Sequence, residues 1–249
     1  MEYCDEVAEI IGAHIGDGWI ESRGNALYIA GHKEDDKDYY DNHLCPLFSK
    51  YFSKVKPRNF DYWSVYGFNL YKKEIIDKII ELGVKKGKKT LIVEFPSWIF
   101  FKKEFMIGAL RGLFDTDGNF HCKKCYGKYD NNFRKKYHCQ PRIEIVSTSK
   151  QLIIQVENIL REIGFHPGMI MIKKANNKNG KNNSESYKIR IDRLNEIKKW
   201  FEELKLSSNP KHISKYYIWR EFRFCPPKLT PEERKQILIN KIDPYFYYN

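Results

Sequence analysis

The chain has 249 residues, and its 44 Lys and Arg against 32 Asp and Glu give a net charge of +12 and an isoelectric point near 9.2. This charge predicts attraction to a polyanion, and an aromatic content of 15% excludes a disordered basic tail. The sequence has no apolar run long enough for a membrane span and no signal-peptide pattern, and its six cysteines are too few for a dense disulfide framework. We therefore expect an intracellular, cytoplasmic protein of two domains, each of about 100–120 residues.

The first half of the chain begins with an apolar helical segment at 7–16, which ends at Asp17-Gly18 and leads into an aromatic strand. Residues 19–31 indicate two strands that turn at 22–25, because aromatic and β-branched residues favour strands. Apolar spacing and alternation then predict a helix over 35–53, a hairpin over 54–71 with its turn at 57–59 or 61–62, and a helix over 73–82. The predicted order is helix, two strands, helix, two strands, helix.

The second half repeats this order after a lysine-rich stretch at 83–89, which predicts a solvated linker. An apolar helix from 105 runs into Asp117-Gly118, so the two Asp-Gly pairs are offset by 100 residues. Strands are predicted at 119–122, 140–147, 169–173 and 187–191, and helices at 150–163 and 194–204. The polar, low-complexity stretch 175–184 predicts a mobile hairpin loop.

The last residues carry a separate helix signal. Thr230 stands in the N-cap position, Pro231 follows in the first turn, and Glu233 occupies the reciprocal capping position. We therefore divide the chain into a first repeat (1–84), a linker (85–100), a second repeat (101–223) and a C-terminal helical tail (224–249).

Small residues recur at intervals of four in both helices that precede the Asp-Gly pairs, at Ala8, Gly12 and Gly16 and at Gly108, Gly112 and Thr116. Residues spaced by four line one helical face, and a face without bulk lets two helices approach closely. If these two faces pack together, Asp17 and Asp117 lie side by side at two helix C-termini. Two carboxylates there repel each other, and bound divalent cations would relieve the repulsion.

The segment Leu110-Arg-Gly-Leu-Phe-Asp-Thr-Asp-Gly118 resembles the signature of the LAGLIDADG homing endonucleases, and residues 10–18 resemble a divergent second copy. The resemblance covers most of the chain, and residues 95–100 are similar to the linker of single-chain members with two repeats. It implies an α+β monomer of two pseudo-symmetric αββαββα repeats, with the signature helices packed at the repeat interface. The antiparallel sheets would form a saddle that binds double-stranded DNA along the major groove.

The resemblance also implies an activity, which is Mg²⁺-dependent, site-specific cleavage of both DNA strands. Asp17 and Asp117 would hold two or more divalent cations, with Gly16 and Thr116 beside them at the metal site. The alternative interpretation is that each Asp-Gly pair only ends a helix and opens a hairpin. The duplication favours metal binding.

In this family a polar or basic side chain near the end of each repeat's second strand helps to position the attacking water. The matching positions are His32 and Lys33 in the first repeat, and Ser147 and Thr148 in the second, which are poor replacements for the usual Gln or Lys. A helix-entry turn with a solvated Lys is the alternative interpretation for the first pair. Because the second repeat lacks the usual Gln or Lys, an alternative function stays open. The protein would then be a former endonuclease that is retained as an RNA splicing cofactor or regulator.

Alternation along the strands places one face of each sheet against the helices and leaves the other for a ligand. Some residues on this outer face would read base edges, with Arg directed to guanine and Glu to cytosine, while lysines neutralise phosphate. Each residue taken alone could instead be an ordinary solvated strand residue. The predicted DNA contacts are Trp19, Glu21, Arg23, Tyr28, Arg58, Tyr66, Asn119, His121, Lys123, Arg142, Glu144, Lys173, Lys188 and Arg190.

A cysteine cluster lies on the first predicted hairpin of the second repeat. Cys122, Cys125 and Cys139, together with His121 or His138, could converge on a tetrahedral zinc ion. Separate buried thiols and a cysteine crosslink are the alternative interpretations.

The charge balance gives a first prediction. Affinity for duplex DNA should fall by about 1,000-fold or more between about 50 and 200 mM salt, because contact with about six or more phosphates releases their counterions. A gel-shift titration at several salt concentrations measures the slope. A flat dependence would show that the charge of +12 is not used on a phosphate backbone.

Overall fold

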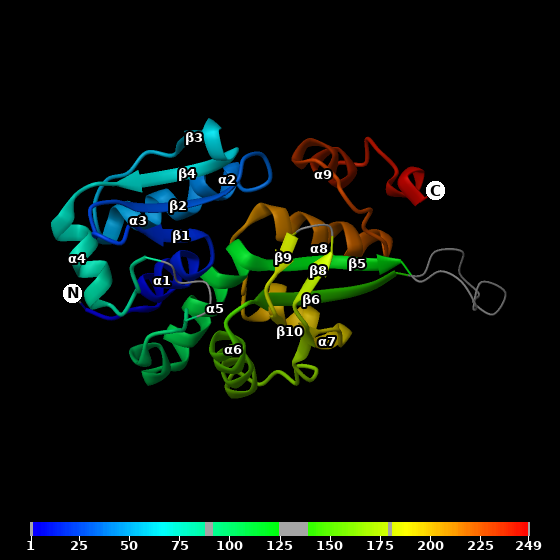
Figure 1. Cartoon of the computed structure of the whole chain (residues 1–249). Helices are drawn as coiled ribbons and strands as arrows, with labels where there is room; N and C mark the ends of the chain where they lie inside the picture. The colour runs from blue at the N-terminus through cyan, green and yellow to red at the C-terminus, as the bar shows by residue number, and fades with distance from the viewer. Residues whose placement is uncertain (1, 88–91, 125–138, 179–180, 249) are drawn as a thin grey trace.

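The structure is a computed structural model, which describes residues 2–87, 92–124, 139–178 and 181–248. It has an α+β fold of two repeated units, as the sequence predicted (Figure 1). The first unit consists of α1 (Asp5–Asp17), β1 (Gly18–Ile20), β2 (Leu27–His32), α2 (Lys37–Tyr39), the π-helical turn η1 (Tyr40–Leu44), α3 (Cys45–Tyr51), β3 (Arg58–Phe60), the turn η2 (Asp61–Trp63), β4 (Val65–Leu70) and α4 (Lys73–Glu81). The turn of its second hairpin therefore lies at 61–63 rather than at 57–59.

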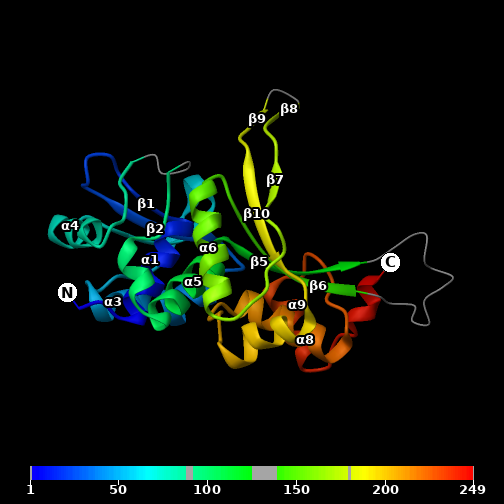
Figure 2. The ribbon, with the colours of Figure 1, turned by 90° about the horizontal axis from the view of Figure 1, so that it is seen from below.

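The second unit follows η3 (Ser97–Phe101) and repeats the same order. It consists of α5 (Lys103–Asp117), β5 (Gly118–Lys124), β6 (Cys139–Ser147), α6 (Lys150–Glu162), β7 (Met171–Lys173), β10 (Ser186–Ile191), α7 (Leu194–Lys198) and the π-helical turn η4 (Lys199–Glu203). The stretch predicted as a loop at 175–184 instead contains two short paired strands, β8 (Asn176–Lys178) and β9 (Lys181–Asn183). Backbone pairing stabilises this ribbon although its side chains are polar, and it projects beyond β7 and β10 (Figure 2).

Each unit contains one four-stranded antiparallel sheet, with strand orders β1-β2-β4-β3 and β5-β6-β10-β7. Strand burial alternates as expected, because every second residue of β2 and β6 packs against helices. In the first sheet the inner residues include Ile29 and Phe68, which face each other across β2 and β4. The apolar residues of both units form one continuous core around α1 and α5.

The helices α1 and α5 pack through the predicted small residues. A Cβ atom added to Gly12 would overlap the carbonyl oxygen of Ala109, and one added to Gly112 would overlap the carbonyl oxygen of Glu9. Glycine lets each backbone lie directly against the other, so the two helices form the central contact between the units. Thr116 replaces glycine at the last position of the second series and lies against Gly16.

The C-terminal part contains two helices and a final turn, which are α8 (Pro210–Phe222), α9 (Pro231–Leu238) and η5 (Pro244–Tyr248). The capping box of α9 forms as predicted between Thr230 and Glu233. Helix α8 was not predicted, although Asn209 caps its N-terminus by accepting a hydrogen bond from the Lys211 amide and Pro210 occupies the first turn. This Asn-Pro pair is the sequence signal that would have identified α8. Among the described residues, no helix is long and apolar enough to cross a membrane.

The close packing of α1 against α5, which we call the helix seam, predicts a large loss of stability when one methyl group is added between the two helices. Gly12→Ala should lower the free energy of unfolding by about 3 kcal/mol or more, because the new Cβ meets a backbone carbonyl that cannot move without separating the helices. Thermal and urea unfolding measure the change. The matched control is Gly168→Ala, where the new Cβ would have no neighbour closer than 3.6 Å. Equal stability of the two variants would contradict the close contact of α1 with α5.

Candidate active site at the helix seam

The helices α1 and α5 end side by side, each on an aspartate. A Cβ atom added to Gly16 would lie 3.3 Å from the carboxyl carbon of Asp117, which places that carboxyl directly against the last turn of α1. The carboxyl of Asp17, the next residue, lies against β2, with its Oδ2 atom 2.5 Å from the position of a Cβ on Gly31. The predicted meeting of the two repeats at these aspartates is therefore present in the structure.

The surroundings of Asp17 oppose its ionisation. Burial raises the pKa of its carboxyl to about 8, and the negative charges of Asp117 and Asp36 add to this effect. The hydroxyl of Tyr40 donates a hydrogen bond of 3.0 Å to Asp17 Oδ2, and the charge of Lys211 also favours the ionised form, but these effects are smaller. A carboxyl pair arranged in this way gains from a bound cation, which would restore ionisation at neutral pH.

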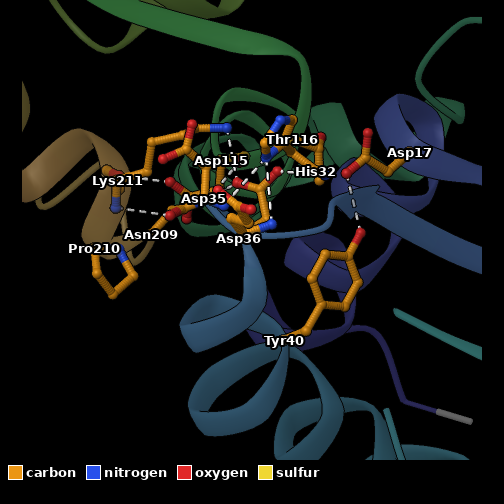
Figure 3. A network of polar contacts seen from close by, with 12 residues as sticks. Asp17, His32, Asp35, Asp36, Tyr40, Asp115, Thr116, Asn209, Pro210 and Lys211 are labelled. Atoms are coloured by element: carbon orange, nitrogen blue, oxygen red, sulfur yellow. Dashed lines mark hydrogen bonds and ion pairs between the residues drawn. The ribbon is translucent and has the colours of Figure 1, made fainter. Parts of the chain in front are cut away.

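A buried polar network joins α8 to both repeats beside these aspartates (Figure 3). Asn209 Nδ2 donates to Asp36 Oδ1 in the first repeat at 2.8 Å and to the backbone oxygen of Asp115 in the second repeat at 2.9 Å. Lys211 Nζ lies 2.7 Å from the same Asp36 oxygen, and the backbone amide of His32 donates to the other Asp36 oxygen at 2.8 Å. Sequence reasoning missed this network because Asn209 and Lys211 meet partners that are 94 to 175 residues away along the chain.

Asp115, the other acid of the second signature segment, is a buried structural residue. Its carboxylate accepts hydrogen bonds from Ser207 Oγ at 2.5 Å and from the backbone amide of Ser208 at 2.7 Å. Burial raises the pKa of this carboxyl to about 7. Asp115 thus fixes the segment that leads into α8.

The two predicted bases lie near the end of β2 but have partners outside the aspartate pair. His32 is exposed, and its Nδ1 atom accepts backbone hydrogen bonds from Glu34 and Asp35, which fix the turn after β2. Lys33 Nζ forms an exposed ion pair of 3.2 Å with Asp61 in the turn between β3 and β4. His32 follows Gly31, which contacts Asp17, so His32 stands one residue from the site and Lys33 points toward another turn.

The predicted DNA contacts of the first repeat separate into three groups. Trp19, Tyr28 and Arg58 lie on the outer face of the sheet, while Glu21 and Arg23 follow β1 in the turn toward β2. The prediction that Tyr66 points outward is wrong. The strand register pairs it with Gly31 and so places it on the same helix-facing side of the sheet as Phe68. It is 7% exposed there, and its hydroxyl donates to Asp41.

The outer face of the second sheet carries a polar row. Asn119 and Glu144 are register partners, as are His121 and Arg142. Lys188 Nζ forms an ion pair of 3.0 Å with Glu144 Oε1, which holds a basic and an acidic group together at the centre of the face. Arg190 and Lys173 lie on the same face, and Lys123 occupies the same strand side in β5, although the position of its side chain lies outside the described residues.

The comparisons with known proteins agree with this arrangement. Residues 104–205 match the model of the LAGLIDADG-like domain. These residues lie in the second repeat, which is therefore similar to a LAGLIDADG-like domain. The resemblance inferred from the signature segments is thereby confirmed. A comparison with curated proteins found no match.

Solved LAGLIDADG structures resemble the chain over most of its length. The homing endonuclease I-DmoI in complex with DNA and Ca has a TM-score of 0.54 and 15% identity, over 86% of this chain and 97% of that one. The meganuclease I-SmaMI bound to uncleavable DNA has a TM-score of 0.55 and 12% identity, over 94% of this chain and 96% of that one. Another I-SmaMI structure holds an uncleaved DNA target in the presence of calcium ions. At these identities the likeness shows a shared LAGLIDADG fold.

Two thiols of the β5–β6 hairpin, those of Cys122 and Cys139, lie close to one further cysteine, Cys225. Burial raises the pKa of the Cys122 thiol, and hydrogen bonding with Cys139 and Cys225 raises it further. Cys225 follows α8, so the cluster joins the hairpin to the C-terminal segment. Cys125 and His138, the other predicted zinc ligands, lie outside the described residues, and among those described no group of three or more His, Cys, Asp or Glu is placed to hold a metal ion. Zinc binding stays a prediction.

The raised pKa of Asp17 predicts a pH-dependent stability when divalent metal is removed. Between its ordinary pKa of 3.8 and its folded pKa of about 8, the carboxyl is ionised only in the unfolded chain, so stability falls as pH rises and levels off above about 8. Asp17→Asn should remove this loss, so its melting temperature should exceed that of the wild type more at pH 9 than at pH 5. Each 1 kcal/mol corresponds to roughly 2–4 °C at this chain length.

Thermal unfolding in EDTA across this pH range measures the effect. Asp77→Asn on α4 is the matched control, since the Asp77 side chain is 47% exposed and forms an ion pair with Lys73 in its own helix. Parallel pH curves for wild type and Asp17→Asn would show that the Asp17 carboxyl is not protonated in the folded chain.

Proposed function

We propose that this protein is a site-specific endonuclease that cuts both strands of double-stranded DNA. The observation that carries the proposal is the meeting of Asp17 and Asp117 at the ends of two helices, each of which leads into its own sheet. A protein that only binds nucleic acid has no need for this repulsive pair. The LAGLIDADG fold and the solved complexes of similar chains with DNA support the choice of substrate.

The residues present fit a divalent cation such as Mg²⁺. Asp17 and Asp117 would hold it, next to Gly16 and Thr116 in the last helical turns, and the destabilised Asp17 carboxylate would gain from the added charge. Magnesium commonly binds one or two carboxylates and completes its shell with water and substrate phosphate, so a group of three protein ligands is not required. When bound, the ion would activate water and stabilise the charge that develops on the phosphate.

The chain's own residues would orient the reacting groups. Tyr40 holds the Asp17 carboxyl through its hydroxyl. The charge of Lys211 favours the ionised form of Asp17, while the negative charge of Asp36, its ion-pair partner, opposes that form more strongly. His32, one residue beyond Gly31, is the candidate for positioning the attacking water in the first repeat. Because its Nδ1 atom accepts backbone hydrogen bonds, its Nε2–H group would donate to that water. On the second sheet, Arg142 and Arg190 would donate to base edges or phosphates.

A second candidate function is nucleic-acid binding without efficient cleavage, as in an RNA splicing cofactor or a regulator. One observation favours it. Ser147, at the position of the second base, accepts a hydrogen bond of 3.1 Å from the Ser149 amide and helps to start α6, whose N-cap is Ser149. The second repeat therefore offers no basic side chain at that position.

The nuclease proposal predicts that Asp17→Asn and Asp117→Asn each slow cleavage by a factor on the order of 100–1,000 or more, because each removes a metal-binding charge while keeping the shape of the side chain. Binding in EDTA should persist or tighten, since less negative charge faces the phosphates. Selection from a library of random duplexes with Mg²⁺ identifies the cut site. Strand-specific cleavage and gel shifts then compare the variants on that site.

Asp77→Asn is the matched control and should cut at the wild-type rate. Cleavage of both strands at the wild-type rate by either site variant would exclude that aspartate as a metal ligand. A wild-type protein that binds a selected duplex but never cuts it with Mg²⁺ would establish the second candidate function instead.

A further inference from the structure

The outer face of the first sheet is covered by aromatic rings, unlike the polar outer face of the second sheet. We call this cluster the aromatic platform. It consists of Trp19 from β1, Tyr28 from β2, Phe60 from β3, Tyr62 and Trp63 from the turn η2, and Tyr71 directly after β4. Two of these residues, Trp19 and Tyr28, were predicted as DNA contacts from the alternation along their strands. That alternation could not predict Tyr62 and Trp63, because they lie in the turn η2.

The rings form one connected surface with Tyr28 at its centre. The ring centroid of Tyr28 lies 5.3 Å from that of Trp19, 5.8 Å from that of Trp63 and 6.5 Å from that of Tyr71. The rings of Trp63 and Tyr71 stand nearly perpendicular to Tyr28, at 83° and 86°. Edge contacts of this kind fix the rings in place without stacking the ring faces of Trp63 and Tyr71 on Tyr28.

The platform is open to solvent, so it is not part of the hydrophobic core. Trp19 is 40% exposed, Trp63 54%, Tyr71 63% and Tyr62 94%, whereas Ile29 and Phe68 on the opposite side of the sheet are fully buried. Single exposed aromatic residues are ordinary, but a contiguous group of large rings marks an interaction site. These rings are not needed to bury the core, because the core side chains of this sheet lie on its other face and are covered by helices.

The surrounding charges indicate a nucleic acid as the ligand. The Arg58 guanidinium lies over the Phe60 ring at 4.7 Å and is exposed, so the platform carries a cation that can reach a phosphate. Arg23 beyond β1 and Lys72 next to Tyr71 are also exposed and basic. Aromatic rings next to basic groups bind unpaired bases by stacking, whereas the edges of paired bases are read by hydrogen-bonding groups such as those on the second sheet.

We propose that the aromatic platform binds the unpaired bases of a single-stranded segment of nucleic acid, with Trp63 and Tyr71 as the principal stacking residues and Arg58 on the phosphates. The ligand chemistry, which is an exposed base on a charged backbone, is shared by single-stranded DNA and RNA. This binding goes beyond the proposed cleavage and uses neither Asp17 nor Asp117.

The test compares two labelled single strands of about twelve nucleotides, one with all its bases and one with abasic residues at every internal position. Both carry the same phosphate charge, so any difference in affinity reports the bases. Fluorescence anisotropy in EDTA should show that wild type binds the complete strand on the order of 10-fold or more tightly than the abasic strand. An RNA strand of the same sequence distinguishes the two sources, and preference for either one supports the proposal.

Trp63→Ala and Tyr71→Ala should each lose most of this preference while keeping the affinity for the abasic strand. Phe101→Ala is the matched control, because Phe101 is 68% exposed but lies in η3, and it should bind like wild type. Thermal unfolding checks that the variants fold. Because Trp63 and Tyr71 are substituted separately, the test still applies if one of the two variants is unstable.

Equal binding of complete and abasic strands by wild type would overturn the proposal, as would a loss in both ring variants that is the same for the two strands. Duplex cleavage is measured separately. A protein that cuts duplex DNA but ignores bases in single strands refutes only the platform, and one that binds single strands but cuts nothing refutes only the nuclease.

Discussion

The direct backbone contact between α1 and α5 is the constraint on which the rest of the structure depends. Gly12 and Gly112 leave no space between the helices, so the last turns of both meet and bring Asp17 and Asp117 together. Each helix continues into the first strand of its own sheet at Gly18 and Gly118. The helix seam therefore sets both the separation of the two carboxyl groups and the relative position of the two sheets.

The C-terminal segment adds a second connection between the repeats. Asn209 binds Asp36 of the first repeat and the backbone of Asp115 of the second, within a buried site where the loss of one partner leaves others unsatisfied. Arg234 of α9 continues this connection by donating to Asp35 at 2.8 Å. Seen in Figure 3, the network lies beside Asp17 and Tyr40, so α8 stabilises the part of β2 and its turn that faces the aspartate pair.

The two repeats have the same topology but different outer faces. The second sheet presents Asn119, His121 and Arg142 together with the Lys188–Glu144 pair, whereas the first presents aromatic rings around Tyr28. The shared backbone pattern follows from the need to bury one face of each sheet against helices, a requirement that does not constrain the opposite face. Each outer face can therefore take a different ligand chemistry without a change of fold.

The sequence by itself determined the helix and strand order that the two repeats share, the small-residue seam and the place of both aspartates, because helix and strand periodicity and residue size act locally and recur in two copies. It did not determine that Tyr66 faces the core, that Lys33 pairs with Asp61, or that Asn209 joins both repeats. These features depend on strand register and on contacts between residues far apart in the chain. Only the tertiary structure decided them, since a shift in register by one residue exchanges the two faces of a strand and no local pattern specifies which distant partner a buried polar group will meet.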